Sequence, residues 1–404
     1  MHAEGRPMDG VPSLCEGLKE QVNRNHRRKR EIMETWQYCA PCLMGVEGIV
    51  GDELKRMDAG EVRVENGRVL FSGGPELLAR ANIGLRCAER VQIFMGSFPA
   101  RSFEELFQGV KALPWEEWIG KNDRFPVKGW SLNSTLHSVP DCQAIIKKAV
   151  VERLKERYHL SWFEETGALY QIQFTLLKDV ATLLIDTSGS GLHKRGYRQN
   201  AGGAPIKETL AAAMADLTRA RTARRVLDPC CGSGTLLIEA ALSAFRIAPG
   251  IRRRFAAMEW SQAPAALWRG ERERARELER RDAAFLAWGG DVDENVLRLA
   301  CENADKAGVG SCFTAQRKEL KDFAPEGESG VVLCNPPYGE RLLDIREAEK
   351  LYREMGRVFR PKKGWSYAVI SPHEDFEKLF GRPADKRRKL YNGMLKCQLY
   401  MYYK

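Results

Sequence analysis

The sequence predicts a doubly wound α/β domain with a mostly parallel sheet, preceded by smaller α+β units. In the second half of the chain, short apolar runs alternate with helical segments, which is typical of a parallel sheet covered by helices. In the first half, alternating apolar segments flank an Asn66-Gly67 pair, a strong signal for a β-hairpin. The length of 404 residues agrees with this organisation, because about 150 residues per domain gives two or three domains.

Composition and charge narrow the class of protein. Hydrophobic residues make up 44% of the chain and charged residues 29%, which excludes a fibrous or largely disordered protein. No apolar run approaches the roughly 18 residues of a membrane span, and residues 1–10 lack the features of a secretory signal. We therefore expect a soluble, cytoplasmic protein with no membrane partner. The formal net charge of +10 favours a polyanionic partner such as nucleic acid.

The cysteines predict neither a disulfide framework nor a metal site. Their number, 11, is odd, and they are scattered over the whole chain. Cys39 and Cys42 form a CxxC pair, but no second pair and no histidine at suitable spacing completes a zinc site. We expect two half-buried thiols there and no metal.

The N-terminal half is expected to contain a tail and two small units. Residues 1–36 include a cluster of five positive charges at Asn23–Arg30 and predict a flexible basic tail, either solvated or in contact with nucleic acid. A first α+β unit is expected at 37–89 and a second at 90–190. Their predicted elements are a strand near Tyr38, a helix at 48–57, the hairpin 62–71, helices at 75–85 and 103–113, a strand-like segment at 125–134, a helix at 141–158 and a hairpin at 170–185.

A Gly- and Ser-rich linker at 191–203 marks the predicted boundary to a C-terminal domain at 204–404. The charged insertion 252–282 is expected to be a solvated helix with mixed-sign pairs, although its start at Arg252–Arg254 can face a nucleic acid. Ligands of such sheets bind at the carboxyl ends of the strands, so we expect the functional site at that edge. The predicted elements are helix 207–219, strand 225–228, helix 235–245, strand 287–291, helix 293–307, strands 312–316, 331–334 and 367–370, and an antiparallel hairpin at 386–403.

The first of these strands is followed by the loop Asp228-Pro-Cys-Cys-Gly-Ser-Gly-Thr235, whose glycines let the backbone approach a ligand closely. The loop lacks the third glycine of a dinucleotide fingerprint and the Gly-Lys-Ser/Thr of a P-loop, and its leading acid would repel a pyrophosphate. An acidic strand end before a Gly-x-Gly turn instead favours a cationic ligand that carries an amino acid group, such as S-adenosylmethionine. The expected cofactor-binding residues are Asp228, Cys230, Gly232, Ser233, Gly234 and Thr235.

Two further acids follow the next strands. Asp291 can accept both ribose hydroxyls of a nucleoside, whereas its neighbour Asp293 is expected to be a helix N-cap. Glu319 follows the third strand and can bond the adenine amino group, with Asp322 as a competitor for that contact.

The motif Asn335-Pro-Pro-Tyr338, directly after a buried strand, is the sharpest chemical signal. Its two prolines fix an extended backbone, so the Asn335 side chain and the Pro336 carbonyl can act as two acceptors aimed at one point. Such a pair suits the exocyclic amino group of a base, while Tyr338 stacks on that base. We expect Asn335, Pro336, Pro337 and Tyr338 to be catalytic. Cys334 is not expected to be a nucleophile, because strand alternation turns its thiol into the core.

These segments resemble the THUMP-containing class I methyltransferases, especially the guanine-N2 methyltransferase module that acts on bacterial large-subunit ribosomal RNA. The resemblance covers about Tyr38 to the C-terminus. It rests on Leu192–Arg198, Ala204–Ala213, Leu227–Ala241 and Asn335–Arg341. It implies a ferredoxin-like domain, a THUMP domain that captures RNA, and a Rossmann-like domain with a mostly parallel seven-stranded sheet, an antiparallel C-terminal hairpin and S-adenosylmethionine as cofactor.

The resemblance also implies roles for the site residues. Asp228, Gly232 and Gly234 would line the methionine end of the cofactor. Asp291 would bind its ribose, and Glu319, where the family more often has Asp, would bind its adenine. The motif that begins at Asn335 would hold the target base.

We therefore expect methyl transfer to the exocyclic N2 amine of a guanine, in 23S rRNA as the first candidate and tRNA as the second. Adenine-N6 methylation of DNA or RNA is an alternative, because the same four-residue motif serves that chemistry, although Gly339-Glu-Arg341 favours guanine. A non-catalytic RNA-binding or ribosome-assembly factor is an alternative of another class. The intact Asp228 loop and Asn335 motif argue against it.

Overall fold

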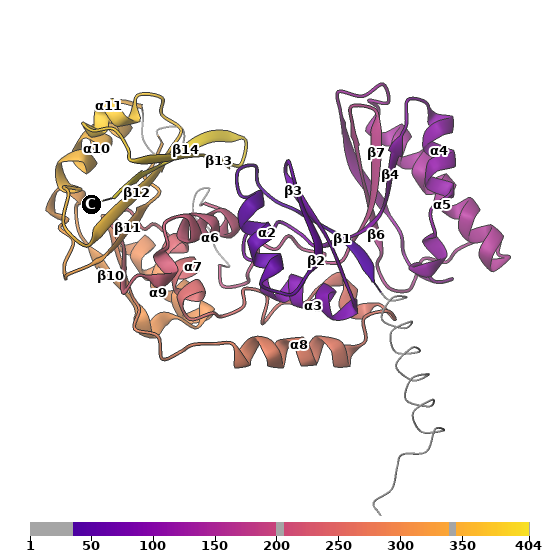
Figure 1. The fold of residues 1–404 in the computed structure, drawn as a ribbon, viewed down its shortest axis with the longest axis horizontal. Helices are drawn as coiled ribbons and strands as arrows, with labels where there is room; N and C mark the ends of the chain where they lie inside the picture. Colours follow the sequence, from indigo (N-terminus) through magenta and orange to yellow (C-terminus); the bar gives the residue numbers. More distant parts are fainter. Residues whose placement is uncertain (1–34, 199–205, 339–344, 404) are drawn as a thin grey trace, which may run out of the picture.

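The computed structural model describes residues 35–198, 206–338 and 345–403, so the basic tail, part of the predicted linker and Gly339-Glu-Arg341 lie outside the described residues. Two seven-stranded sheets organise the molecule, one in each half of the chain (Figure 1). None of the described helices is long and apolar enough to cross a membrane.

The N-terminal sheet has the strand order β2-β3-β1-β4-β7-β6-β5. It joins the two predicted α+β units, because β1 pairs antiparallel with β4, with Tyr38 opposite Ile93. No strand was expected at the position of β4. The elements are β1 (Trp36–Pro41), α2 (Glu47–Lys55), β2 (Gly60–Glu65), β3 (Arg68–Gly73), α3 (Pro75–Gly84), β4 (Gln92–Pro99), α4 (Phe103–Lys111), β5 (Val127–Leu132), α5 (Val139–Tyr158), β6 (Gln171–Leu177) and β7 (Val180–Asp186).

The C-terminal sheet has the order β10-β9-β8-β11-β12-β14-β13 and confirms the predicted doubly wound fold. Its first five strands run parallel, and β14 is antiparallel to both of its neighbours. The strands are β8 (Arg225–Asp228), β9 (Leu286–Asp291), β10 (Phe313–Arg317), β11 (Gly330–Cys334), β12 (Trp365–Ser371), β13 (Lys386–Asn392) and β14 (Leu395–Tyr402). The helices are α6 (Glu208–Leu217), α7 (Thr235–Ala244), α8 (Ala265–Glu277), α9 (Glu294–Ala307), α10 (Ile345–Val358) and α11 (Phe376–Phe380).

The chain order of this sheet reverses at β8. After β8 the chain continues on one side through β9 and β10, and then crosses to the other side to form β11 and β12. Such a reversal opens a crevice at the carboxyl ends of the two central strands, which is where ligands of doubly wound sheets bind. Here those strands are β8 and β11, and each is followed by one of the predicted motifs.

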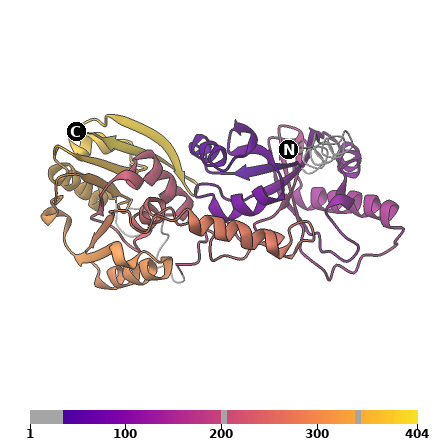
Figure 2. The ribbon, with the colours of Figure 1, turned by 60° about the horizontal axis from the view of Figure 1, so that its bottom comes forward.

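Helix α8 corrects the prediction of a solvated insertion. It lies along α3 of the N-terminal half (Figure 2), and Trp268 on it is 1% exposed and stacked on Phe255. Glu271 receives two hydrogen bonds from Arg80 of α3, at 2.9 and 2.8 Å. The helix and a mixed-sign pair within it are confirmed, since Arg274 pairs with Glu271 at 3.7 Å, but the buried Trp268 and Glu271 show that α8 is not fully solvated. A mixed-sign pattern does not show whether the charges pair within the helix or with a distant one.

Candidate active site

The structure brings the two main motifs together at the reversal point. Strands β8 and β11 are adjacent and parallel, with Val331 opposite Val226. At their carboxyl ends, Cys334 lies close enough to Asp228 and Cys230 for each to influence the pKa of its thiol. The glycine loop and the Asn335 motif are therefore neighbours at the carboxyl ends of β8 and β11, the end of the sheet at which the sequence predicts the site.

Two glycines give the loop its shape. Gly232 and Gly234 have φ values of +51° and +79°, a left-handed conformation that other residues rarely adopt. A Cβ atom on Gly234 would lie 3.1 Å from the Cβ of Ala300, so this glycine lets α7 begin close to α9. A Cβ on Gly232 would meet no atom within 4 Å. The backbone at Gly232 thus borders open space that a ligand can fill.

The acids that follow β8 and β9 differ in environment. Asp228 is 1% exposed, and burial raises its pKa to about 7, an effect that nearby Asp291 increases and a hydrogen bond from the Cys230 amide opposes. Asp291 is half-buried and accepts a hydrogen bond from the Gly232 amide at 3.1 Å. Asp293 caps α9 by accepting from the Asn295 amide at 2.8 Å, which confirms the predicted N-cap.

Glu319 lies apart from this pair. It follows β10, its side chain is 60% exposed, and it forms an ion pair with Lys321 at 2.5 Å. The hydrogen bond from Lys321 and its positive charge lower the pKa of Glu319. Asp322 is also exposed. Among the described residues, neither acid makes a contact that favours it over the other, so the choice between them stays a prediction.

The Asn335 motif contains an internal hydrogen bond that the sequence did not suggest. The Tyr338 hydroxyl donates to Asn335 Oδ1, and the tyrosine ring packs partly buried against the core. An amide oxygen has two lone pairs, so one acceptor position on Asn335 remains for a ligand. In this arrangement the hydroxyl of Tyr338 orients Asn335, and stacking of its ring on a base stays a prediction.

Cys334 itself is buried in the core, as expected. It is 0% exposed, and burial raises its pKa well above the usual value for a thiol. A thiol in this environment stays protonated and hidden from a substrate, so it is a poor nucleophile.

The residues that support the glycine loop at Thr235 were not identified from the sequence. Arg198 donates to the hydroxyl of Thr235 at 3.3 Å and pairs with Glu208 at 3.2 Å, and the Thr235 hydroxyl is also 3.2 Å from that of Ser233. Glu208 begins the apolar helix α6 and is 3% exposed. The position of Glu208 in an Ala- and Leu-rich helix could have indicated such a contact, because a buried carboxylate requires a partner.

Comparison with known proteins places these features in one class. Residues 37–92 match the RlmL ferredoxin-like domain, residues 100–186 match the THUMP domain, and residues 195–401 match the UPF0020 family, described as the RMKL-like methyltransferase domain. The fold and the crevice therefore define a class I methyltransferase with an N-terminal THUMP region.

Full-length relatives agree with these matches. The chain is 44% identical over 373 residues to YpsC of Bacillus subtilis (strain 168), a provisional RNA methyltransferase, covering 92% of this chain and 97% of YpsC. The crystal structure of SMU.472, a provisional methyltransferase complexed with SAH, has a TM-score of 0.86 at 44% identity and covers 92% of this chain and 98% of its own. A predicted N6-adenine-specific DNA methylase from Listeria monocytogenes str. 4b F2365 has a TM-score of 0.86 at 46% identity, with 93% and 98% covered. The chain belongs to the UPF0020 family of RMKL-like methyltransferases.

Proposed function

We propose that this protein transfers a methyl group from S-adenosylmethionine to the exocyclic N2 amine of a guanine in RNA, with 23S rRNA as the first candidate. The observation that carries the proposal is the parallel pairing of β8 and β11, because it places the acidic loop after β8 beside the Asn335 motif after β11. The similarity to a provisional RNA methyltransferase and the match to a THUMP domain support RNA as the substrate.

The residues of the crevice fit S-adenosylmethionine by their chemistry. The open space at Gly232 borders two acids, buried Asp228 and half-buried Asp291. In our proposal Asp228 and the loop through Thr235 bind the charged methionine end, and Asp291 accepts from the ribose hydroxyls. Glu319 or Asp322 binds the adenine. Bound S-adenosylmethionine supplies an electrophilic methyl carbon.

The chain's own contribution to chemistry lies in the second motif. The amine of guanine is a weak nucleophile, because its lone pair is delocalised into the base. Asn335 Oδ1 and the Pro336 carbonyl each accept a hydrogen bond from the amine. These two bonds favour a more pyramidal nitrogen with an available lone pair. Tyr338 holds Asn335 in place through its hydroxyl. No covalent intermediate is required, which agrees with a buried Cys334.

Nucleoside mass spectrometry tests the modified base and the RNA together. Total 23S rRNA and tRNA from a strain lacking this gene are compared with the parent strain. The proposal expects loss of N2-methylguanosine at one site in 23S rRNA, restored by the wild-type gene but not by an Asn335→Ala variant. Loss of N2-methylguanosine from tRNA alone would identify tRNA, and not 23S rRNA, as the substrate. An unchanged N2-methylguanosine content in both RNAs would refute the proposed reaction.

Adenine-N6 methylation is the second candidate. The description of the Listeria protein as a predicted N6-adenine-specific DNA methylase favours it, and the two acceptors of the Asn335 motif suit the adenine amine equally well. Loss of N6-methyladenine in the same experiment would select this reaction. The residues Gly339-Glu-Arg341, which favour guanine, lie outside the described part of the chain.

A further inference from the structure

A cavity of about 590 Å³ lies beside the amino ends of the strands of the C-terminal sheet, whereas the candidate active site lies at their carboxyl ends. Helix α7 begins at Thr235 in the cofactor loop and ends at Ala244, where Leu242 and Ile247 line the cavity. Ten helical residues span about 15 Å, so the cavity is a separate site. It is lined by Ser190, Lys194, Arg195, Gly196, Tyr197, Leu242, Ile247, Ala248, Pro249, Ile251, Arg252, Arg253, Arg254, Arg276, Glu279, Arg281, Lys306 and Ala307.

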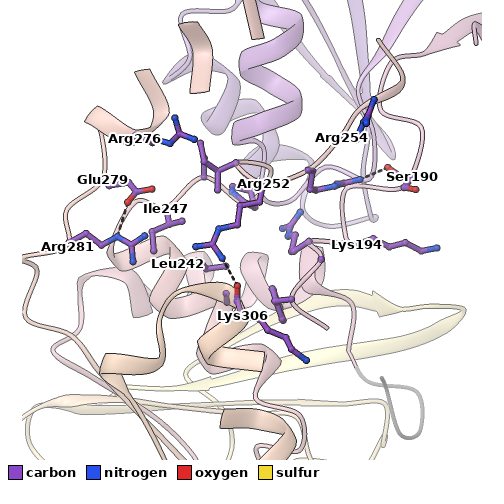
Figure 3. A pocket seen from close by; sticks show the side chains of 18 residues that line it. Ser190, Lys194, Leu242, Ile247, Arg252, Arg254, Arg276, Glu279, Arg281 and Lys306 are labelled. Atoms are coloured by element: carbon purple, nitrogen blue, oxygen red, sulfur yellow. Dashed lines mark hydrogen bonds and ion pairs between the residues drawn. The ribbon is translucent and has the colours of Figure 1, made fainter. Parts of the chain in front are cut away.

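The lining is strongly basic. It contains eight Lys or Arg side chains and one acid, Glu279. Figure 3 shows Arg252 between two groups of cations, with Arg276 and Arg281 on one side and Lys194 and Arg254 on the other. They come from the start of the linker 191–203, the start of the insertion 252–282, the end of α8 with the residues after it, and the end of α9, so the fold gathers them from four separate segments.

Most of these cations lack an acidic partner, unlike the basic residues that hold the two halves together. Arg80 pairs with Glu271 at 2.8 Å and Lys207 with Glu89 at 3.1 Å. Three cations of the cavity also have an acidic partner: Arg195 pairs with Glu239 at 3.4 Å, Arg254 with Glu259 at 3.9 Å and Arg281 with Glu279 at 2.8 Å. In contrast, no carboxylate of the described residues pairs with Lys194, Arg252, Arg276 or Lys306, all of which are exposed. Their charges are thus available to an external anion.

Arg253 is the most informative member of the cavity. It is 8% exposed and donates to the Ser190 carbonyl at 2.8 Å, but within the described residues it pairs with no acid. Burial, together with the charges of Arg195 and Arg90, lowers its pKa to about 10. Its guanidinium lies 5.2 Å from the centroid of the Phe255 ring, and the charges of Glu208 and Asp186 oppose the lowering of its pKa. Because no acid is in direct contact with it, this buried guanidinium adds a favourable position for an anion to the exposed cations around it.

We propose that this basic cavity binds the phosphodiester backbone of the substrate RNA, as an anchor separate from the THUMP domain and from the site of chemistry. The proposal rests on RNA being the substrate. Two observations favour a polymer over a small phosphorylated ligand. The cations extend onto the exposed rim, where Arg254 is 86% exposed, and the cavity adjoins the linker that connects the RNA-capturing half to the catalytic half.

The test removes three exposed rim charges and compares them with three equivalent charges elsewhere. The cavity variant is Lys194→Gln, Arg276→Gln and Lys306→Gln. The control is Lys363→Gln, Lys378→Gln and Lys386→Gln, which lie near strands β12 and β13, are also exposed and do not line the cavity. Affinity for a 23S rRNA transcript is measured between about 50 and 200 mM salt, along with S-adenosylmethionine affinity by calorimetry.

The cavity variant should bind the transcript about 10- to 100-fold more weakly than the control, and the slope of log affinity against log salt should become shallower by about two. Its affinity for S-adenosylmethionine should match that of the wild type. Glu279 offers a variant of opposite sign, because it neutralises Arg281 at 2.8 Å. Glu279→Gln should bind the transcript about two- to threefold more tightly.

Two outcomes would overturn the proposal. The first is equal RNA affinity and salt slope in the cavity variant and the control, while the wild type methylates RNA. The second is stabilisation of the wild type by pyrophosphate that the cavity variant loses while its RNA affinity is unchanged, because this would identify a small-ligand site. A wild type that methylates no RNA would instead refute the proposed function, so the two failures are distinguishable.

Discussion

The two edges of the C-terminal sheet differ in charge. At the carboxyl edge, the residues that end or follow the described strands include the acids Asp228, Asp291 and Glu319. At the opposite edge, the cavity gathers eight basic side chains around one acid. The acidic edge suits a cationic methyl donor, and the basic edge suits a polyanion. In our proposals, one sheet therefore attracts the cationic donor to the carboxyl ends of its strands and the polyanionic RNA to the basic cavity, so the two ligands bind at separate places.

The edges also differ in how the chain builds them. Each element of the acidic edge is a loop that directly follows its own strand, so the donor binding and amine recognition that we propose depend on a few short motifs. The basic edge exists only after four distant segments have packed together. Variants at the acidic edge should therefore change chemistry or donor affinity and leave RNA affinity unchanged, whereas cavity variants should do the reverse.

The largest effect is expected for Asn335→Ala. Loss of one of two preorganised acceptors should reduce methyl transfer by about 10²- to 10³-fold. Donor affinity should stay within about threefold of the wild-type value, because in our proposal the Asn335 side chain bonds the base and makes no hydrogen bond to the donor. Single-turnover transfer of labelled methyl groups measures the first quantity and calorimetry the second. Turnover equal to that of the wild type would remove Asn335 from the reaction.

These motifs could be predicted because each follows a local rule. A glycine with positive φ in a tight loop, an aspartate that caps a helix and an Asn-Gly turn between alternating strands depend on residues within a few positions. The structure has Gly232 at +51° and Asp293 as the cap of α9, and a hairpin of β13 and β14 around Asn392-Gly393.

The missed features depend on partners far along the chain. Glu271 pairs with Arg80, 191 positions away, and no pattern within α8 identifies that partner. The hydrogen bond from Tyr338 to Asn335 depends on a side-chain rotamer that the core around the tyrosine selects. The basic cavity was expected only in part. The sequence indicates that Arg252–Arg254 can face a nucleic acid, but no local pattern shows that the cations of the other three segments pack around them.

The next largest effect is expected for Asp291→Ala. Loss of hydrogen bonds to a charged acceptor costs about 1–3 kcal/mol, so donor affinity should fall about 5- to 150-fold. Asp293→Ala is the matched control in the same loop. It removes the α9 cap and should lower the free energy of unfolding by about 1 kcal/mol with donor affinity unchanged. Calorimetry and thermal melts separate these effects, and equal donor affinity in both variants would remove Asp291 from the ribose.

Two substitutions of Tyr338 separate its two proposed roles, which are orientation of Asn335 and stacking on the base. Tyr338→Phe keeps the ring and loses the hydroxyl that orients Asn335. If orientation matters, this variant should lose about tenfold in methyl transfer, in line with one hydrogen bond. Tyr338→Ala removes the ring as well and should lose more if the ring stacks on the base, since stacking contributes about 1–3 kcal/mol. Full activity of the phenylalanine variant would assign the residue to stacking alone.

The smallest effect, and the one most specific to the acidic edge, is a pH dependence of donor binding. Burial raises the pKa of Asp228 to about 7 in the free protein, whereas a cationic donor requires the ionised carboxylate. Below about pH 7, binding must therefore release a proton, and donor affinity should fall by up to about tenfold per pH unit. Calorimetry in buffers of different ionisation enthalpy measures that proton release directly.

Asp228→Asn supplies the control for this pH dependence. Because the folded pKa lies above the unfolded value of about 3.9, ionisation of Asp228 costs stability as the pH rises through the range from about 4 to 7. The asparagine variant escapes that cost, so it should melt at a higher temperature than the wild type at pH 8. It should bind the donor more weakly there, with an affinity that no longer varies with pH. A wild-type donor affinity that is equal at pH 6 and pH 8 would mean that the carboxylate of Asp228 does not face the donor's charge, and the acidic edge would then owe its donor affinity to Asp291 alone.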